Sequence, residues 1–232
     1  MSKTGGGIGT NQYKTRGTTK RKLRAPTPDL IDKSFSIESP ISRRDRLMEI
    51  AQSGSESDRV NVAVDERTPH AVQFYLARDS NTAVRAGLAT NKRLHISLAK
   101  NLYEEGDIII LACLASNPNT PWDILERLAR HKSAQVRQQV AQNPRLSYSF
   151  FTALCADESS IVRAAAAASE QIRPEQLCQL ADDTVDSVKI AVAMNKTTPI
   201  DILMQLARDR SPVVRQIAMK VLPEHARMMI NI

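Results

Sequence analysis

Basic side chains recur at one position of a 26-residue period, and they form the most regular chemical pattern of this 232-residue sequence. A row of cations at fixed spacing can contact the phosphates of a nucleic acid, whose backbone carries regular negative charge. The same cations can form ion pairs with carboxylates inside the protein. The basic column consists of Arg59, Arg85, Arg137, Arg163, Lys189 and Arg215, and it is interrupted at Leu111.

Acidic side chains follow the same period, six positions before the basic column. They are Asp79, Glu105, Asp157, Asp183 and Asp209, with Ser53 and His131 at the corresponding positions of two other units. Because acid and base recur together, we favour a structural ladder of ion pairs. A basic ribbon that binds phosphates is the alternative, and neutralising Arg137 and Arg163 separates the two, since only a ladder contributes to stability.

The first 24 residues hold seven of the 32 basic side chains and none of the 25 acidic ones, so the rest of the chain is electrically balanced. Glycine is also concentrated there, and few large apolar groups are present, so residues 1–38 are predicted to form a disordered basic Gly/Thr/Lys/Arg-rich tail. Such an arm can bind a nucleic-acid backbone. The candidate contacts are Lys14, Arg16, Lys20, Arg21, Lys22 and Arg24.

Other roles for this tail are a solubilising or processed leader and, more weakly, attachment to an acidic membrane surface. It lacks the apolar stretch of a secretory signal, and no run in the chain is long enough to span a membrane. We therefore expect a cytoplasmic protein that makes no membrane contact.

A leucine or isoleucine recurs every 26 residues from Ile50 to Leu206, which indicates a stack of like units and not one compact core. Apolar residues at helical spacing, as in Ile124, Leu125 and Leu128, predict one helix in each unit, and a second begins near a valine such as Val136. The prediction is an all-α solenoid of about seven 26-residue helix-turn-helix repeats over 39–220. Residues 221–232 are predicted to be a C-terminal capping helix, with exposure as a partner site as the alternative.

Each unit opens with a small polar residue that is able to close one helix and lead to the next, as Asn91 and Asn117 do. Thr120-Pro121 and Thr198-Pro199 then predict helix starts, with threonine as the N-cap and proline as the first helical residue. Paired small residues near the end of the second helix, such as Val140-Ala141, allow neighbouring helices to approach closely.

The units resemble the leucine-rich repeat variant, a family related to the HEAT-like α-solenoids. The resemblance rests on Asn117 through Pro121, Leu125, Leu128-Ala129, Val136-Arg137 and Val140-Ala141, and the same pattern returns from Asn143 and from Asn195. It implies a HEAT-like superhelix, in which Asp and Arg of adjacent units are paired. The family prototype has an iron–sulfur cysteine cluster before its repeats, but no cysteine precedes residue 39 here, so no cluster is implied.

The middle of the repeat is irregular where Leu111 and His131 interrupt the two charged columns. His95, Trp122 and His131 lie near this irregularity in the sequence and are candidates for a partner-binding patch. The alternative is that Trp122 packs at the first turn of its helix.

No arrangement typical of a catalytic, cofactor or metal site is present, so we expect a non-enzymatic protein without cofactors. Cys113, Cys155 and Cys178 lack metal-ligand spacing and are predicted to be buried, reduced thiols. Trp122-Asp123 leaves a HEAT-like alkylpurine DNA glycosylase as a lesser alternative.

The sequence thus favours an adaptor whose solenoid binds a protein partner, while the basic arm adds nucleic-acid affinity. The principal alternative is nucleic-acid binding by body and arm together.

Overall fold

The computed structural model describes residues 42–228, except for the side chain of His225. These residues belong to one compact unit, 40–232, and every regular element in the described part is an α-helix. The predicted tail, with its six candidate basic residues, and the last four residues of the predicted capping helix lie outside the described range.

The described helices alternate between the two positions of the repeat, so that an odd-numbered helix opens each unit and an even-numbered helix closes it. Their bounds are α1 Arg43–Ser53, α2 Glu56–Val64, α3 His70–Leu76, α4 Thr82–Thr90, α5 Ile96–Glu105, α6 Ile108–Ser116, α7 Trp122–Leu128, α8 Ala134–Ala141, α9 Tyr148–Cys155, α10 Ser160–Ala167, α11 Pro174–Ala181, α12 Asp186–Met194, α13 Ile200–Leu206, α14 Pro212–Val221 and α15 Glu224–Met228.

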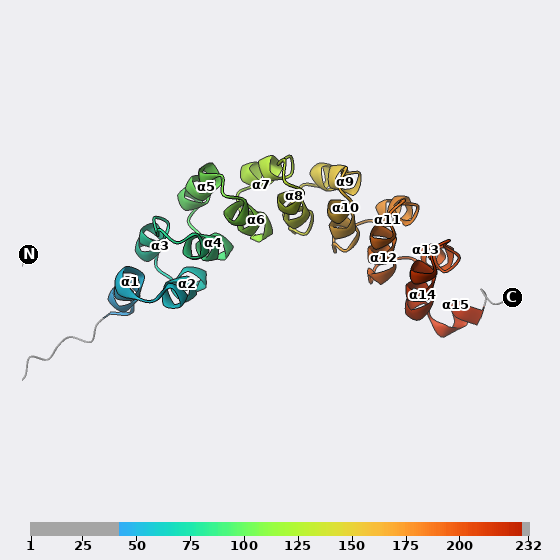
Figure 1. Cartoon of the computed structure of the whole chain (residues 1–232), viewed down its shortest axis with the longest axis horizontal. Coiled ribbons are helices and arrows are strands. Elements are labelled where there is room, and N and C mark those ends of the chain that lie inside the picture. The colour runs from blue at the N-terminus through green and yellow to red at the C-terminus, as the bar shows by residue number, and fades with distance from the viewer. Residues whose placement is uncertain (1–41, 229–232) are drawn as a thin grey trace, which may run out of the picture. The chain divides into compact units, whose positions relative to one another are not determined.

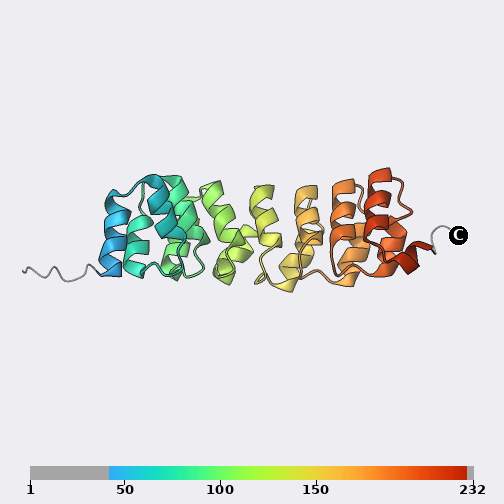
Figure 2. The ribbon, with the colours of Figure 1, turned by 90° about the horizontal axis from the view of Figure 1, so that it is seen from below.

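Residues 42–228, taken by themselves, form two rows of helices (Figure 1). The even-numbered helices lie on the inner side of the bend in this unit, and the odd-numbered helices lie on its outer side. Figure 2 shows the helices of successive units standing side by side. The predicted α-solenoid is therefore confirmed.

The periodic leucines occupy the interior between the two rows. Leu76, Leu102, Leu128, Leu180 and Leu206 are at most 2% exposed, whereas Ile50, in the first unit, is only partly buried. The even helices approach one another closely because small residues separate them. Gly87 shows this best, since a Cβ there would lie 3.2 Å from the Cγ1 of Val64 on the preceding even helix.

Asparagines at the start of the units form polar bridges between neighbouring repeats. The Nδ2 of Asn117 donates to the carbonyl oxygens of Ala89, at 2.8 Å, and Asn91, at 2.9 Å, while its Oδ1 accepts from the Asn119 amide. Asn91, Asn143 and Asn195 make the same pair of bonds, to carbonyl oxygens 28 and 26 residues before them. These residues were predicted only to form turns, so the bridge between units is an additional role.

Ser169 replaces asparagine in the sixth unit, and its shorter side chain does not make this bridge. Gln171 supplies a bond in its place, since its Nε2 donates to the carbonyl oxygen of Asn143 at 2.6 Å. A neighbouring residue thus restores part of the link that the substitution removes.

The predicted threonine N-caps are wrong. The backbone places Pro69, Pro121 and Pro199 at the N-caps, with helices starting one residue later. The hydroxyl of Thr120 instead donates to the carbonyl oxygen of Leu114, in the last turn of the preceding helix, at 2.6 Å. Thr68 and Thr198 make the equivalent bond. The hydroxyl is drawn there because the last carbonyls of a helix lack partners within it.

The cysteines are free but not uniformly buried. Cys155 is buried, Cys113 is partly buried and Cys178 is exposed, so the prediction of burial is wrong for Cys178. At the C-terminal end, α15 follows Pro223 as predicted, and Leu222 and Ala226 join the core while Met228 is exposed. Whether this helix serves as a cap stays a prediction.

None of the helices in the described range combines the length and the apolar character needed to cross a membrane.

Replacing Asn117 by alanine should lower the free energy of unfolding by about 2–3 kcal/mol, because two buried carbonyl groups lose their donor. The measurement is chemical denaturation followed by circular dichroism. Asn101→Ala is the matched control, since Asn101 is exposed on α5. Equal stability of the two variants would show that the bridge does not hold the units together.

Candidate functional site

The charged columns meet between units, where each basic residue contacts the acid twenty positions later. The Nε of Arg137 donates to Asp157 at 2.7 Å and its Nη2 donates to the other carboxylate oxygen at 2.8 Å. Arg163 pairs in the same way with Asp183, and the Nζ of Lys189 contacts Asp209 at 2.8 Å. Arg59 with Asp79 and Arg85 with Glu105 complete the rungs in the first units.

Each arginine in these rungs also ties down its own unit. The Nη1 of Arg137 donates to the backbone carbonyl oxygen of His131, and the Nη1 of Arg163 donates to the backbone carbonyl oxygen of Asp157. Arg215 makes carbonyl contacts of this kind to Asp209 and Arg210, but within residues 42–228 it has no carboxylate partner. Arg215, the last predicted member of the ladder, therefore bonds only within its own unit, because no further repeat follows it in the described chain.

Burial makes the ladder carboxylates sensitive to their partners. Desolvation acts to raise the pKa of Asp157, but hydrogen bonds from Arg137 and from the Ser159 amide outweigh it, so the pKa lies below its usual value. The pKa of Asp183 is lowered in the same way, against desolvation, by Arg163 and the Val185 amide. These contacts favour the ladder over a basic ribbon, because the guanidinium groups are already bound to carboxylates.

The gap in the ladder is filled without charge. Leu111 is buried, and the Nδ1 of His131 accepts from the Ser133 amide at 3.1 Å. An aspartate oxygen accepts the equivalent amide in the neighbouring units, as from Ser159. Desolvation, followed by the positive charges of Lys132 and Arg137, lowers the pKa of His131, which keeps this nitrogen able to accept.

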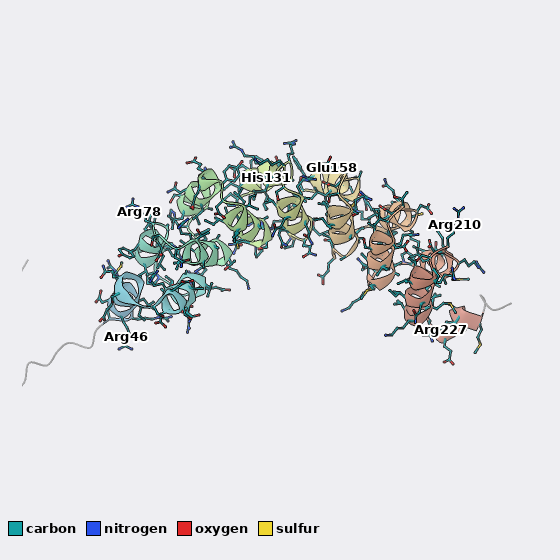
Figure 3. The ribbon with its side chains drawn as sticks, in the orientation of Figure 1. Arg46, Arg78, His131, Glu158, Arg210 and Arg227 are labelled. Atoms are coloured by element: carbon teal, nitrogen blue, oxygen red, sulfur yellow. The ribbon has the colours of Figure 1, made fainter. Side chains whose placement is uncertain are left out.

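The predicted partner-binding patch is divided in the structure. His131 follows the C-terminal end of α7, whereas Trp122 begins that helix and His95 precedes α5. His131 therefore belongs to the edge formed by turns within units, which also carries Arg78, Glu158 and Arg210 and lies toward the odd row (Figure 3). Residues close in sequence were separated because α7 runs from one edge to the other.

Trp122 is 70% exposed, so the alternative that it packs at the first turn of its helix is wrong. It belongs to a column of exposed first residues of the odd helices, in which Ile96, Tyr148 and Ile200 are also exposed. His95 lies on the same edge but has structural contacts. Its ring is 5.1 Å from that of His70, and its Nδ1 accepts from the Ser97 amide.

One register of the even helices that turns away from the odd row, here called the inner face, was not identified from the sequence. The exposed acids Glu56, Asp58 and Asp186 lie in the first turns of α2 and α12, outside this register. Its positions recur at i, i+3, i+4 and i+7 on each helix, opposite the buried positions. From α2 to α12 none of them is charged. They are Ser57, Val60, Asn61, Val64, Ala83, Ala86, Gly87, Thr90, Ile109, Ala112, Cys113, Ser116, Gln135, Gln138, Gln139, Gln142, Ile161, Ala164, Ala165, Ala168, Ser187, Ile190, Ala191 and Met194. All are at least partly exposed except Ala86, Gly87 and Ala165, which are buried.

Several of these inner-face side chains are large and exposed. Ile109, Ile161 and Met194 are 59%, 49% and 65% exposed. The odd row is different, since the helices of that row carry exposed charges such as Lys100, Arg127 and Asp201. A contiguous uncharged surface on a protein whose other side is charged is typical of an interaction site.

Concave sites elsewhere are shallow. A groove of about 760 Å³ lies between α1 and α3, lined by Met48, Phe74, Tyr75 and Arg78 among others, and it is open to solvent. In the described part of the chain no group of His, Cys, Asp and Glu side chains is arranged to hold a metal ion.

The solved structures that match this chain include one titled "A leucine-rich repeat variant with a novel repetitive protein structural motif". It is 24% identical to this chain, with 78% of this chain and 72% of that chain covered and a TM-score of 0.54. This chain has the leucine-rich repeat variant fold. The expected resemblance is thus confirmed at the level of fold.

No protein-family model matches the sequence, and the search of curated proteins finds no match. The leucine-rich repeat variant fold therefore has to be interpreted from its own surfaces.

Replacing Arg137 by leucine should lower the free energy of unfolding by about 3–5 kcal/mol, because Asp157 is left buried without its partner. The double variant Arg137→Leu, Asp157→His reproduces the natural Leu111–His131 rung and should recover at least half of that loss. Denaturant titration measures both. Arg208→Leu, at an exposed site, is the control, and a single Arg137 variant as stable as that control would refute the structural ladder.

Stability should also decrease below neutral pH because of His131. Since its pKa is lowered in the folded state, protonation favours the unfolded chain. Its contribution is fully present above the ordinary histidine pKa of about 6.5 and is lost as pH falls toward the folded pKa. The ladder aspartates add a second loss below about pH 4 by the same reasoning.

His131→Asn isolates the first of these losses, because its carbonyl oxygen can accept from Ser133 without titrating. Thermal melts of both proteins between pH 7 and pH 5 provide the measurement, and the other histidines are common to the two curves. Parallel curves would mean that His131 is equally titratable in the folded and unfolded states.

Proposed function

We propose that the repeat body is a non-enzymatic protein-binding scaffold whose inner face docks an uncharged, apolar segment of a partner protein. The observation that carries this proposal is the absence of charge on the inner face from α2 to α12. The buried centres of protein interfaces are depleted of charged residues in the same way.

The inner face argues against nucleic acid as the ligand of the body. Binding a nucleic acid requires cations that displace the counterions of its phosphates. The inner face offers none before Lys220 of α14, and the periodic arginines nearby are held by carboxylates. A protein segment needs apolar contact instead, which Ile109, Ile161 and Met194 supply.

The basic arm is proposed to add nucleic-acid affinity that is separate from the docking of the partner. Support comes from the sequence, because residues 1–24 contain basic side chains and no acidic ones, whereas the rest of the chain has equal numbers of basic and acidic side chains. A cytoplasmic site of action is proposed with it, because the three cysteines are free and two of them are at least partly buried, as suits a reducing compartment.

A photo-crosslinking residue at position 168 tests the scaffold, with the same residue at position 156 as control. Both positions hold exposed alanines, but Ala168 lies on the inner face and Ala156 follows an odd helix. In extract, we expect a discrete protein adduct from position 168 alone. Nuclease should leave it intact, and Ile161→Glu with Met194→Glu should remove it, because charges cannot be buried there without partners. Mass spectrometry identifies the adduct.

The arm is tested in the same preparation by changing Lys14, Arg16, Lys20, Arg21, Lys22 and Arg24 to alanine. This variant should keep the protein adduct and lose co-purifying nucleic acid. An adduct made of nucleic acid, or one that disappears with nuclease, would instead favour recognition of nucleic acid by body and arm together.

A further inference from the structure

The inner face is divided at its centre by four glutamines on one helix. Gln135, Gln138, Gln139 and Gln142 follow the i, i+3, i+4, i+7 pattern of α8, and Gln142 is its C-cap. All four are at least partly exposed, and within residues 42–228 none of their amide groups makes a side-chain hydrogen bond. Gln73, Gln171, Gln176 and Gln205 bond to neighbouring groups. Gln52, Gln179 and Gln216 make no such bond in the described chain either, but they are single residues, whereas the glutamines of α8 form a row.

Apolar surfaces border this glutamine row on both sides. Helices α6 and α10 are the even-row neighbours that pack against α8. Toward α6 the inner face presents Ile109, Ala112 and Cys113, and toward α10 it presents Ile161 and Ala164. The central part of the inner face is therefore a polar, uncharged strip between two apolar strips.

The chemistry of the strip selects a ligand with free main-chain groups. Each glutamine offers an amide donor and a carbonyl acceptor, which complement the N–H and C=O groups of a peptide bond. A bound helix has already satisfied its own main chain, so it gains little from such a row. An extended segment has those groups free and gains both affinity and register from them.

The dimensions agree with an extended segment that runs along α8. Seven helical steps from Gln135 to Gln142 span about 10.5 Å at 1.5 Å per residue, which is the length of about three extended residues at 3.3 Å each. Side chains of an extended chain point alternately to opposite sides. Successive side chains would therefore reach α6 and α10, which lie about 8–10 Å to either side at typical helix spacing.

We propose that the glutamine row of α8 binds the main chain of an extended, uncharged segment of a partner protein, whose alternate apolar side chains pack on α6 and α10. This inference rests on the proposed scaffold function and specifies how its ligand is held. Specificity lies in the alternation of apolar side chains, and the glutamines fix the orientation of the backbone.

The probe is a displayed library of random 12-residue peptides, selected on the full chain. Enriched peptides should contain a short run of uncharged residues with apolar side chains, and their affinity is measured by fluorescence anisotropy. Gln138→Met with Gln139→Met should weaken binding at least tenfold, because methionine keeps the length and removes the hydrogen bonds. Gln179→Met, at an exposed position of α11 in the odd row, is the matched control and should leave affinity unchanged.

Two further measurements locate the peptide and define its backbone. N-methylation of its central amides should weaken binding at least tenfold, because it removes peptide N–H groups that donate hydrogen bonds to the glutamine side-chain oxygens. Bound peptide should slow alkylation of Cys113, on the inner face, without changing that of Cys178, which is exposed on the odd row.

The outcomes separate this inference from the scaffold function. One outcome is that Ile161→Glu with Met194→Glu abolishes peptide binding while the glutamine variant and N-methylation leave it unaffected. That result would overturn binding through the main chain and would leave the scaffold function intact. Peptides that bind as helices overturn it equally. Both proposals fail if no peptide is enriched on the natural chain relative to the Ile161→Glu, Met194→Glu variant. They also fail if bound peptide does not protect Cys113 from alkylation, because the inner face is then not a peptide site.

Discussion

The fold depends on polar contacts that cross from one unit to the next at a fixed separation. An isolated pair of short helices buries too little apolar surface to be stable, so each unit relies on its neighbours. Hydrophobic packing alone would tolerate some sliding of one unit over another. The Asn117 amide holds one position, because it donates to the carbonyl oxygens of Ala89 and Asn91 on either side of the point where the preceding unit begins. Arg137 and Asp157 impose the same separation at the opposite edge of the stack.

These two edges explain why the period is held so closely along the chain. Turns between units carry the asparagines, and turns within units carry the ladder carboxylates. An insertion in either turn would break bonds to a neighbour as well as local ones. Between the two edges, the buried leucines pack beside small residues of the same size in each unit. Alanines such as Ala115 and Ala141 occupy these positions.

The sequence was sufficient to predict the repeat, its helices and the residues of the ladder, because each depends on a spacing that recurs. It was not sufficient for features set by the relative direction of helices. The threonines were assigned to the helix that follows them, but Thr120 bonds to the helix before it. His131 and Trp122 are separated by the length of α7, although both are near the same irregularity in the sequence. The inner face escaped notice because its residues are small, varied and defined only by the absence of charge.

Departures from the repeat carry different information according to where they fall. At Leu111 and His131 the two partners of a rung change together, so the substitution is compensated and stability accounts for it. Stability does not explain the four glutamines of α8 in the same way. They are accessible, make no internal side-chain bonds in the described structure and interrupt a surface that is apolar on either side. A departure that stability does not require points to a ligand, and the centre of the inner face is where the departure is largest.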